Sequence, residues 1–240
     1  MMKPGERTSA PIPAPDGAYL DAAFLCVVLT VPFFYLLLPS FLPKAAAEIL
    51  SIRLLVPPLA VLLITSLASL LCSPEIPAKR KFGIQAGRPF PWKAVISYWL
   101  FLYVFLILVS GAVKALANRF GLSLPEQDAV QLLACSDVTG KALIIFSSIL
   151  IAPLTEEFIF RHIFFSCAAY RIGGGPASVL TAVLFSALHA NLLQAPSLFF
   201  MSLILQAVYV KTGRLTVPVL IHALFNTVSV ILILLIHIRT

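Results

Sequence analysis

Long apolar stretches separated by short polar ones dominate the pattern of this chain. Because a helix needs about 20 mostly apolar residues to cross a bilayer, the pattern predicts seven membrane spans, of which the fifth and sixth are short. The predicted spans cover residues 19–43, 51–72, 94–116, 142–165, 177–192, 196–211 and 215–237. The expected fold class is therefore all-α, a polytopic helix bundle embedded in a membrane.

Composition supports this pattern and removes several function classes. Of the 240 residues, 60% are hydrophobic and 11% charged, and the mean hydropathy is +1.00, values far from those of a soluble domain. The net charge of +7 indicates cytoplasmic loops rather than a nucleic-acid surface, since a basic excess in a membrane protein usually marks its inner side. The lipid bilayer is thus an expected partner, and nucleic acid is not.

The chain divides into three parts. Residues 1–18 are polar and proline-rich, which predicts a flexible tail. Residues 19–138 hold the first three spans and carry no recognisable chemistry, whereas residues 139–240 hold the remaining spans and most of the candidate polar residues. We therefore expect an N-terminal transmembrane part followed by a catalytic core.

The basic residues predict the orientation of the bundle. The loop between the second and third spans has a single acid, Glu75, against five basic residues, which places it in the cytoplasm. Counting outward from it puts the N-terminus in the cytoplasm as well, in a multi-pass protein of the cell inner membrane. The five basic residues are Lys79, Arg80, Lys81, Arg88 and Lys93.

Two adjacent acids stand out in the apolar fourth span. An ionisable residue at membrane depth costs about 2.5–3.5 kcal/mol to insert, so each one is a candidate for function. Glu157 has Arg161 four residues later on the same helix face, which predicts a structural ion pair. Glu156 points about 100° away and has no basic residue three or four positions on. It is therefore the acid available for chemistry.

Four histidines also lie in this part of the chain. For His162 and His237 we expect hydrogen-bonded structural roles, with His237 near the membrane surface. His222 differs because Asn226 follows one helical turn later on the same face, where lipid would penalise both polar groups. Taken alone, this pair fits a structural role as well as a functional one.

His189 is brought towards Glu156 if Gly173, Gly174 and Gly175 form the turn of an antiparallel helix pair. The two residues would then differ in height by only about 5 Å, less than one helical turn. Pro153, one turn before Glu156, removes a helix hydrogen bond and leaves the carbonyl of residue 149 without its partner. Such a break fits a widened cavity or an ordinary membrane-helix proline equally well.

These residues resemble the three motifs of the CPBP intramembrane proteases, the family of CAAX proteases and bacteriocin-processing enzymes. The motifs EExxxR, FxxxH and HxxxN read here as Glu156 to Arg161, Phe185 to His189 and His222 to Asn226. Each motif is weak alone, but all three in order within membrane helices form a specific pattern over residues 140–230. The resemblance implies an endopeptidase in which Glu156 and His189 activate water and His222 and Asn226 stabilise the oxyanion.

The same resemblance implies a membrane-associated protein or peptide as the substrate, and a second shell in which Arg161 orients Glu157. Catalysis is expected to need no metal, because a carboxylate, two imidazoles and an amide supply a base and oxyanion donors. A zinc site formed by Glu156, His189 and His222 is the nearest alternative. A proton-coupled transporter or a binding-only immunity protein is the non-enzymatic one.

The position of His222 also predicts where the cavity opens. It lies about 10 Å along the helix from the turn between Lys211 and Arg214. We therefore expect the cavity to open on the side of that turn, which the charge distribution assigns to the cytoplasm.

Overall fold

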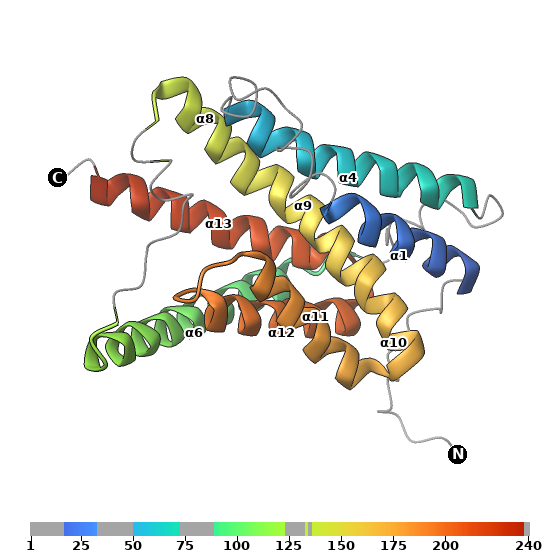
Figure 1. The fold of residues 1–240 in the computed structure, drawn as a ribbon. Helices are drawn as coiled ribbons and strands as arrows, with labels where there is room; N and C mark the ends of the chain where they lie inside the picture. The colour runs from blue at the N-terminus through green and yellow to red at the C-terminus, as the bar shows by residue number, and fades with distance from the viewer. Residues whose placement is uncertain (1–16, 33–49, 73–88, 123–132, 134–135, 238–240) are drawn as a thin grey trace, which may run out of the picture.

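The computed structural model describes residues 17–32, 50–72, 89–122, 133 and 136–237. The proline-rich tail, the second half of the first predicted span and most of the basic loop lie outside these residues. Across the described residues the chain forms helices and no strand, so the all-α prediction is confirmed (Figure 1). The helices are α1 (Gly17–Pro32), α4 (Leu50–Cys72), α6 (Trp92–Arg119), a long rod over residues 138–172, α11 (Gly174–Leu188), α12 (Ala195–Thr212) and α13 (Thr216–His237).

Four of these helices are long and apolar enough to cross a membrane: α6, the rod, α12 and α13. The helix α11 is apolar but has only 15 residues, in line with the short fifth span expected. Apolar side chains such as Leu108 and Leu116 of α6 are largely exposed, as lipid-facing residues should be. The protein is therefore a multi-pass integral membrane protein.

The rod is longer than the predicted fourth span and is not a uniform α-helix. It begins where the Asp137 carboxylate accepts a hydrogen bond of 2.8 Å from the Gly140 N–H. It then passes through α8 (Val138–Phe146), the π-helix η2 (Ser147–Ile151), α9 (Ala152–Glu157), a second π-helix η3 (Phe158–Phe165) and α10 (Ser166–Ile172). Wide π turns are rare and often lie at functional sites. Both acids of the fourth span belong to α9, between the two π segments.

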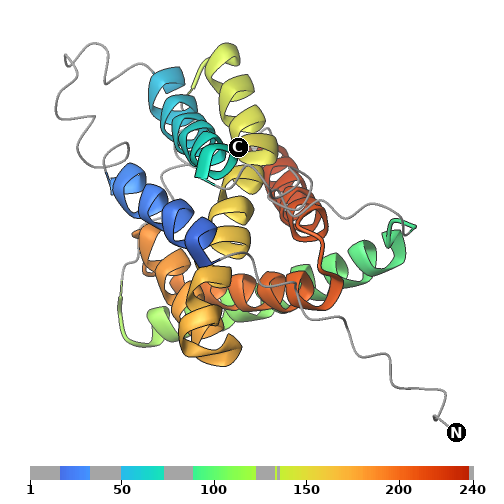
Figure 2. The same cartoon turned by 90° about the vertical axis from the view of Figure 1, so that its right-hand side faces the viewer.

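The rod separates two groups of helices (Figures 1 and 2). On one side α4 packs against α8, η2 and α9, and α1 packs against η3 and α10. On the other side α6 packs against α12 and α13, while α13 also contacts η2 and α9. The α9 segment is thus enclosed by α4 and α13.

Glycines at two turns allow the chain to reverse. Gly173 ends the rod with φ +83°, and Gly213 ends α12 with φ +65°, conformations in which other residues would be strained. The predicted glycine turn is therefore present at Gly173, whereas Gly174 and Gly175 form the first turn of α11. This reversal packs α11 against α10 and η3.

Candidate active site

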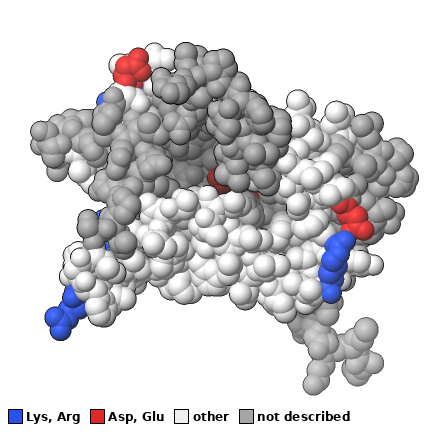
Figure 3. All heavy atoms as spheres, viewed as in Figure 1, with Lys and Arg blue, Asp and Glu red and all other residues white. Residues whose placement is uncertain are grey.

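One cavity contains all four residues expected to be catalytic. It has a volume of about 650 Å³ and is lined by α6, the first half of the rod, the turn between α11 and α12, the start of α12, and α13. Figure 3 shows the surface hollowed near the centre of the view, with an acidic side chain at depth. The polar lining residues are Tyr103, Ser110, Lys114, Ser148, Glu156, His189, Gln194, Ser197, His222, Asn226 and Ser229.

The cavity does not open on the expected side. The lining residues of α6 run from Tyr103 to Lys114, in its second half, and those of α13 run from His222 to Ile233. Both helices start near the Lys211 to Arg214 turn and lead away from it, so the cavity extends towards the opposite end of the bundle. The expectation of an opening beside that turn is wrong, because the first turns of α6 and α13 are sealed by apolar packing around Val95 and Val217.

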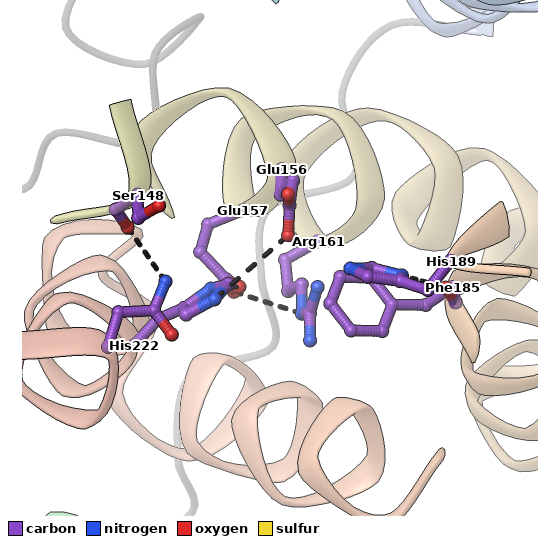
Figure 4. Close-up of polar contacts among 8 residues, drawn as sticks. Ser148, Glu156, Glu157, Arg161, Phe185, His189 and His222 are labelled. Atoms are coloured by element: carbon purple, nitrogen blue, oxygen red, sulfur yellow. Dashed lines mark hydrogen bonds and ion pairs between the residues drawn. The ribbon is translucent and has the colours of Figure 1, made fainter. Parts of the chain in front are cut away.

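Glu157 lies on the face of α9 that is buried by packing and does not line the cavity, the sealed face. Its Oε2 is 3.0 Å from Nε of Arg161, and both side chains are fully buried, so the predicted ion pair is present (Figure 4). Its other oxygen, Oε1, is 2.9 Å from Nδ1 of His222, a contact that the sequence did not reveal. The Arg161 guanidinium also lies 4.7 Å above the Phe185 ring. Glu157 therefore joins the rod to α13 and is more than the partner of one arginine.

Glu156 lies on the open side of the same helix. Its side chain is 26% exposed and lines the cavity. Its Oε2 faces Nε2 of His222 at 4.0 Å, too far for a direct hydrogen bond. An oxygen atom at hydrogen-bond distance of about 2.8 Å from both atoms fits beside this gap. The pair can therefore hold a water molecule or a substrate oxygen between a carboxylate and an imidazole (Figure 4).

His189 is oriented by the end of α11. Its Nδ1 is 2.8 Å from the carbonyl oxygen of Phe185, and since a carbonyl only accepts, Nδ1–H is the donor. The neutral ring then carries its lone pair on Nε2, the atom left for chemistry. The next residue, Ala190, has φ +49°, an unusual conformation at the point where α11 ends and the cavity wall begins.

Asn226 is held by the π turn of the rod. Its Nδ2 donates a hydrogen bond of 2.8 Å to the carbonyl of Ser148. In η2 the Ala152 N–H donates to the carbonyl of Ser147, five residues earlier. In the same register the carbonyl of Ser148 would accept from the N–H of residue 153, but Pro153 has no N–H. The unpaired carbonyl is therefore that of Ser148, which accepts from Asn226. The expectation that it would be the carbonyl of residue 149 is wrong, because the helix has a π register here. The amide keeps its second N–H for the cavity.

His162 lies apart from this arrangement. His162 is buried in η3 with Nδ1 2.9 Å from the Tyr209 hydroxyl, so its expected structural role is confirmed. The His237 side chain lies outside the described residues.

The zinc alternative names Glu156, His189 and His222 as the metal donors. Among the described residues, no group of three or more His, Cys, Asp or Glu side chains is close enough to hold a metal ion. Nδ1 of His222 contacts Glu157 and Nδ1 of His189 a carbonyl, which leaves Nε2 of each ring available, an arrangement that metal-binding histidines also show. We derive no step through a metal.

Comparison with known proteins agrees with the motifs. Residues 138–228 match the family model of the type II CAAX prenyl endopeptidase Rce1-like proteins. Over this segment the chain is similar to the CPBP family of CAAX proteases. The matched segment runs from the start of the rod to the middle of α13 and includes all four cavity residues named above.

Three relatives show the same likeness. YdiL of Bacillus subtilis, a proposed membrane peptidase, is 26% identical over 134 residues, 56% of this chain and 55% of that protein. The membrane-embedded CAAX protease MroQ of Staphylococcus aureus is 34% identical over 95 residues, 37% of this chain and 38% of MroQ. An uncharacterised 24.3 kDa protein of Escherichia coli is 27% identical over 150 residues, 59% of this chain and 63% of that protein.

The chain thus matches between about two fifths and two thirds of the length of these relatives. No solved structure matches it. The family match covers the part of the cavity formed by the rod, the turn between α11 and α12, and the first half of α13, but not the wall formed by α6.

Proposed function

We propose that this protein is an intramembrane endopeptidase that hydrolyses a peptide bond of a membrane-associated protein or peptide. The observation that carries the proposal is the gap of 4.0 Å between Glu156 Oε2 and His222 Nε2 in a cavity within the helix bundle. A carboxylate at this gap can take a proton from water while the imidazole contacts the oxygen that gains charge. The similarity to the family supports the same reaction.

In the proposed reaction Glu156 is the general base and His189 positions the water through Nε2. The water attacks the carbonyl carbon, Glu156 takes the proton, and the carbonyl oxygen becomes an oxyanion. Nε2 of His222 and the second N–H of Asn226 donate to that oxygen. When the carbon–nitrogen bond breaks, the proton held by Glu156 passes to the leaving amine.

This assignment requires that His222 carry a proton on each nitrogen. Nδ1–H donates to Glu157, so Nε2 donates to an oxyanion only in the imidazolium form. Among the described residues, Glu156 and Glu157 are the carboxylates that face His222, and Glu157 also pairs with Arg161.

The proposed substrate reaches the site from the membrane in which the protein is embedded. We place the N-terminus in the cytoplasm and the protein in the cell inner membrane, supported by the basic loop between the second and third spans. In this orientation the cavity extends away from the cytoplasm.

The test is a search for cleaved proteins in cells. Membrane proteomes of cells with the wild-type protein and with Glu156→Gln are compared for new protein ends, and candidate substrates are then cleaved by purified protein. Ends that appear only with the wild type, and that purified wild type reproduces, support the proposal. Identical proteomes together with a phenotype retained by Glu156→Gln would indicate a binding-only protein.

A further inference from the structure

The cavity carries opposite charges at its two ends. Among the described residues that line it, Glu156 is the only acid and Lys114 the only lysine or arginine. Lys114 lies in the second half of α6, and its side chain is exposed. No described carboxylate lies within salt-bridge distance of it. The ammonium group is therefore accessible to a ligand in the cavity.

The packing of α6 on α13 fixes how far apart these charges are. The two helices run in the same direction, and the rings of Tyr103 and Phe225 meet at 5.5 Å, beside Asn226. Lys114 is eleven residues beyond Tyr103, which at 1.5 Å per residue is about 16 Å along the helix. The lysine side chain can reach back by several ångströms. An extended peptide of about three to five residues, at about 3.3 Å each, spans the remaining distance.

The wall between the two charges suits an extended peptide. It contains no further lysine, arginine, aspartate or glutamate among the described lining residues. Ser110 of α6 and Ser197 of α12 hydrogen-bond to each other at 2.9 Å, which ties the two helices together in this wall. Gly111 lies next to Ser110, and a Cβ placed there would meet no atom within 4 Å. The cavity is thus open beside Gly111.

We propose that Lys114 is a specificity-determining residue that binds a carboxylate of the substrate, about three to five residues from the cleaved bond. The inference rests on the proposed function and adds one recognition element to it. Opposite charges favour one direction of the peptide, because a substrate carboxylate is attracted to Lys114 and repelled by Glu156. The carboxylate belongs either to an aspartate or glutamate side chain or to a free C-terminus.

The experiment uses a degenerate synthetic peptide library, once with free and once with amidated C-termini. Purified full-length wild type, Lys114→Gln, Lys114→Glu and Arg119→Gln in detergent micelles cleave the library, and mass spectrometry identifies the products. Arg119→Gln is the matched control, because Arg119 ends the same helix but does not line the cavity. In parallel, immobilised Glu156→Gln protein, with and without Lys114→Glu, captures peptides without cleaving them.

The wild type and Arg119→Gln are expected to favour a carboxylate at the stated spacing by about two- to fivefold, the range of one exposed ion pair. Lys114→Gln should lose this preference, and Lys114→Glu should reverse it towards lysine and arginine. A preference that persists in the amidated library identifies a side-chain carboxylate, and one that disappears identifies the C-terminus.

Cleavage without any carboxylate preference, or a preference that Lys114→Glu leaves unchanged, overturns this inference and leaves the proposed protease intact. Absence of cleavage by wild type counts against the proposed function. Capture by the Glu156→Gln protein then still decides the inference: enrichment of acidic peptides that Lys114→Glu abolishes supports it, and equal capture of all peptides overturns it.

Discussion

The two faces of α9 carry neighbouring glutamates in opposite surroundings. On the sealed face Glu157 is fully buried and engages Arg161 and His222 at 3.0 and 2.9 Å. On the open face Glu156 keeps 26% of its side chain exposed and makes no contact with His222 shorter than 4.0 Å. A carboxylate whose oxygens are both engaged holds neighbouring groups in place, whereas one facing a cavity has room for water. In the proposed function, this contrast assigns a supporting role to Glu157 and the role of general base to Glu156.

The largest effect apart from Glu156 is expected at Asn226. Asn226→Ala removes one proposed oxyanion donor and leaves the Ser148 carbonyl without the amide that it contacts. Loss of one such donor typically lowers turnover about 10²- to 10³-fold. Steady-state cleavage of an identified substrate measures the effect. A variant that folds and cleaves at the wild-type rate would show that Asn226 does not stabilise the oxyanion.

Substitutions on the sealed face should lower the stability of the protein. Glu157→Ala leaves Arg161 buried without its carboxylate and frees Nδ1 of His222, and breaking a buried ion pair costs about 3–5 kcal/mol. We expect lower yield and a lower midpoint in thermal unfolding of the detergent-solubilised protein. Arg171→Ala is the matched control, since its pair with Asp21 is exposed and worth little. Equal loss in both variants would contradict the distinction between buried and exposed pairs.

A smaller effect is expected from a substitution at Gly111, in the α6 wall of the cavity. Gly111→Leu places an apolar side chain into the cavity without a clash at Cβ. Substrate should then bind less well, raising KM several-fold. Stability should hold or rise slightly, since replacing glycine within a helix gains about 1 kcal/mol. Unchanged kinetics would show that substrate does not pass this part of the cavity.

The smallest effect is expected from metal removal. Because the proposed reaction uses a carboxylate, imidazoles and an amide, activity should survive dialysis against a strong chelator. The measurement is cleavage rate before and after chelation, together with metal content by mass spectrometry. Stoichiometric zinc whose removal abolishes activity and whose return restores it would overturn the metal-free mechanism.

Helix periodicity predicted much of this site. The spacing of Glu157 and Arg161 gave their ion pair, and that of His222 and Asn226 placed both on one face of α13. Local spacing could not reveal the bond between Glu157 and His222, because it joins residues far apart in the chain. The unpaired carbonyl could not be identified from the sequence for the same reason. Pro153 shows that one backbone donor is missing, but the π register of η2 and the position of Asn226 in α13 decide that Ser148 has the unpaired carbonyl.

The direction of the cavity could not be read from the sequence either. The distance of His222 from the Lys211 to Arg214 turn was estimated along the helix. That distance does not tell which end of the cavity is closed by helix packing. In the fold, apolar contacts of α6, α12 and α13 close that side. Lys114 was missed for a similar reason, since it belongs to a predicted span that carries no motif and reaches the cavity only through tertiary packing.

The most direct test of the contrast between the two faces is the turnover number of Glu156→Gln and Glu157→Gln, each corrected for the fraction of folded protein. Glutamine keeps the shape of either side chain and removes its charge. We expect Glu156→Gln to fold like the wild type, to bind substrate and to lose turnover about 10²- to 10⁴-fold. Glu157→Gln should yield less folded protein with residual turnover above that of Glu156→Gln. Appreciable turnover by Glu156→Gln alongside well-folded, inactive Glu157→Gln would assign the base to the sealed face and contradict this account.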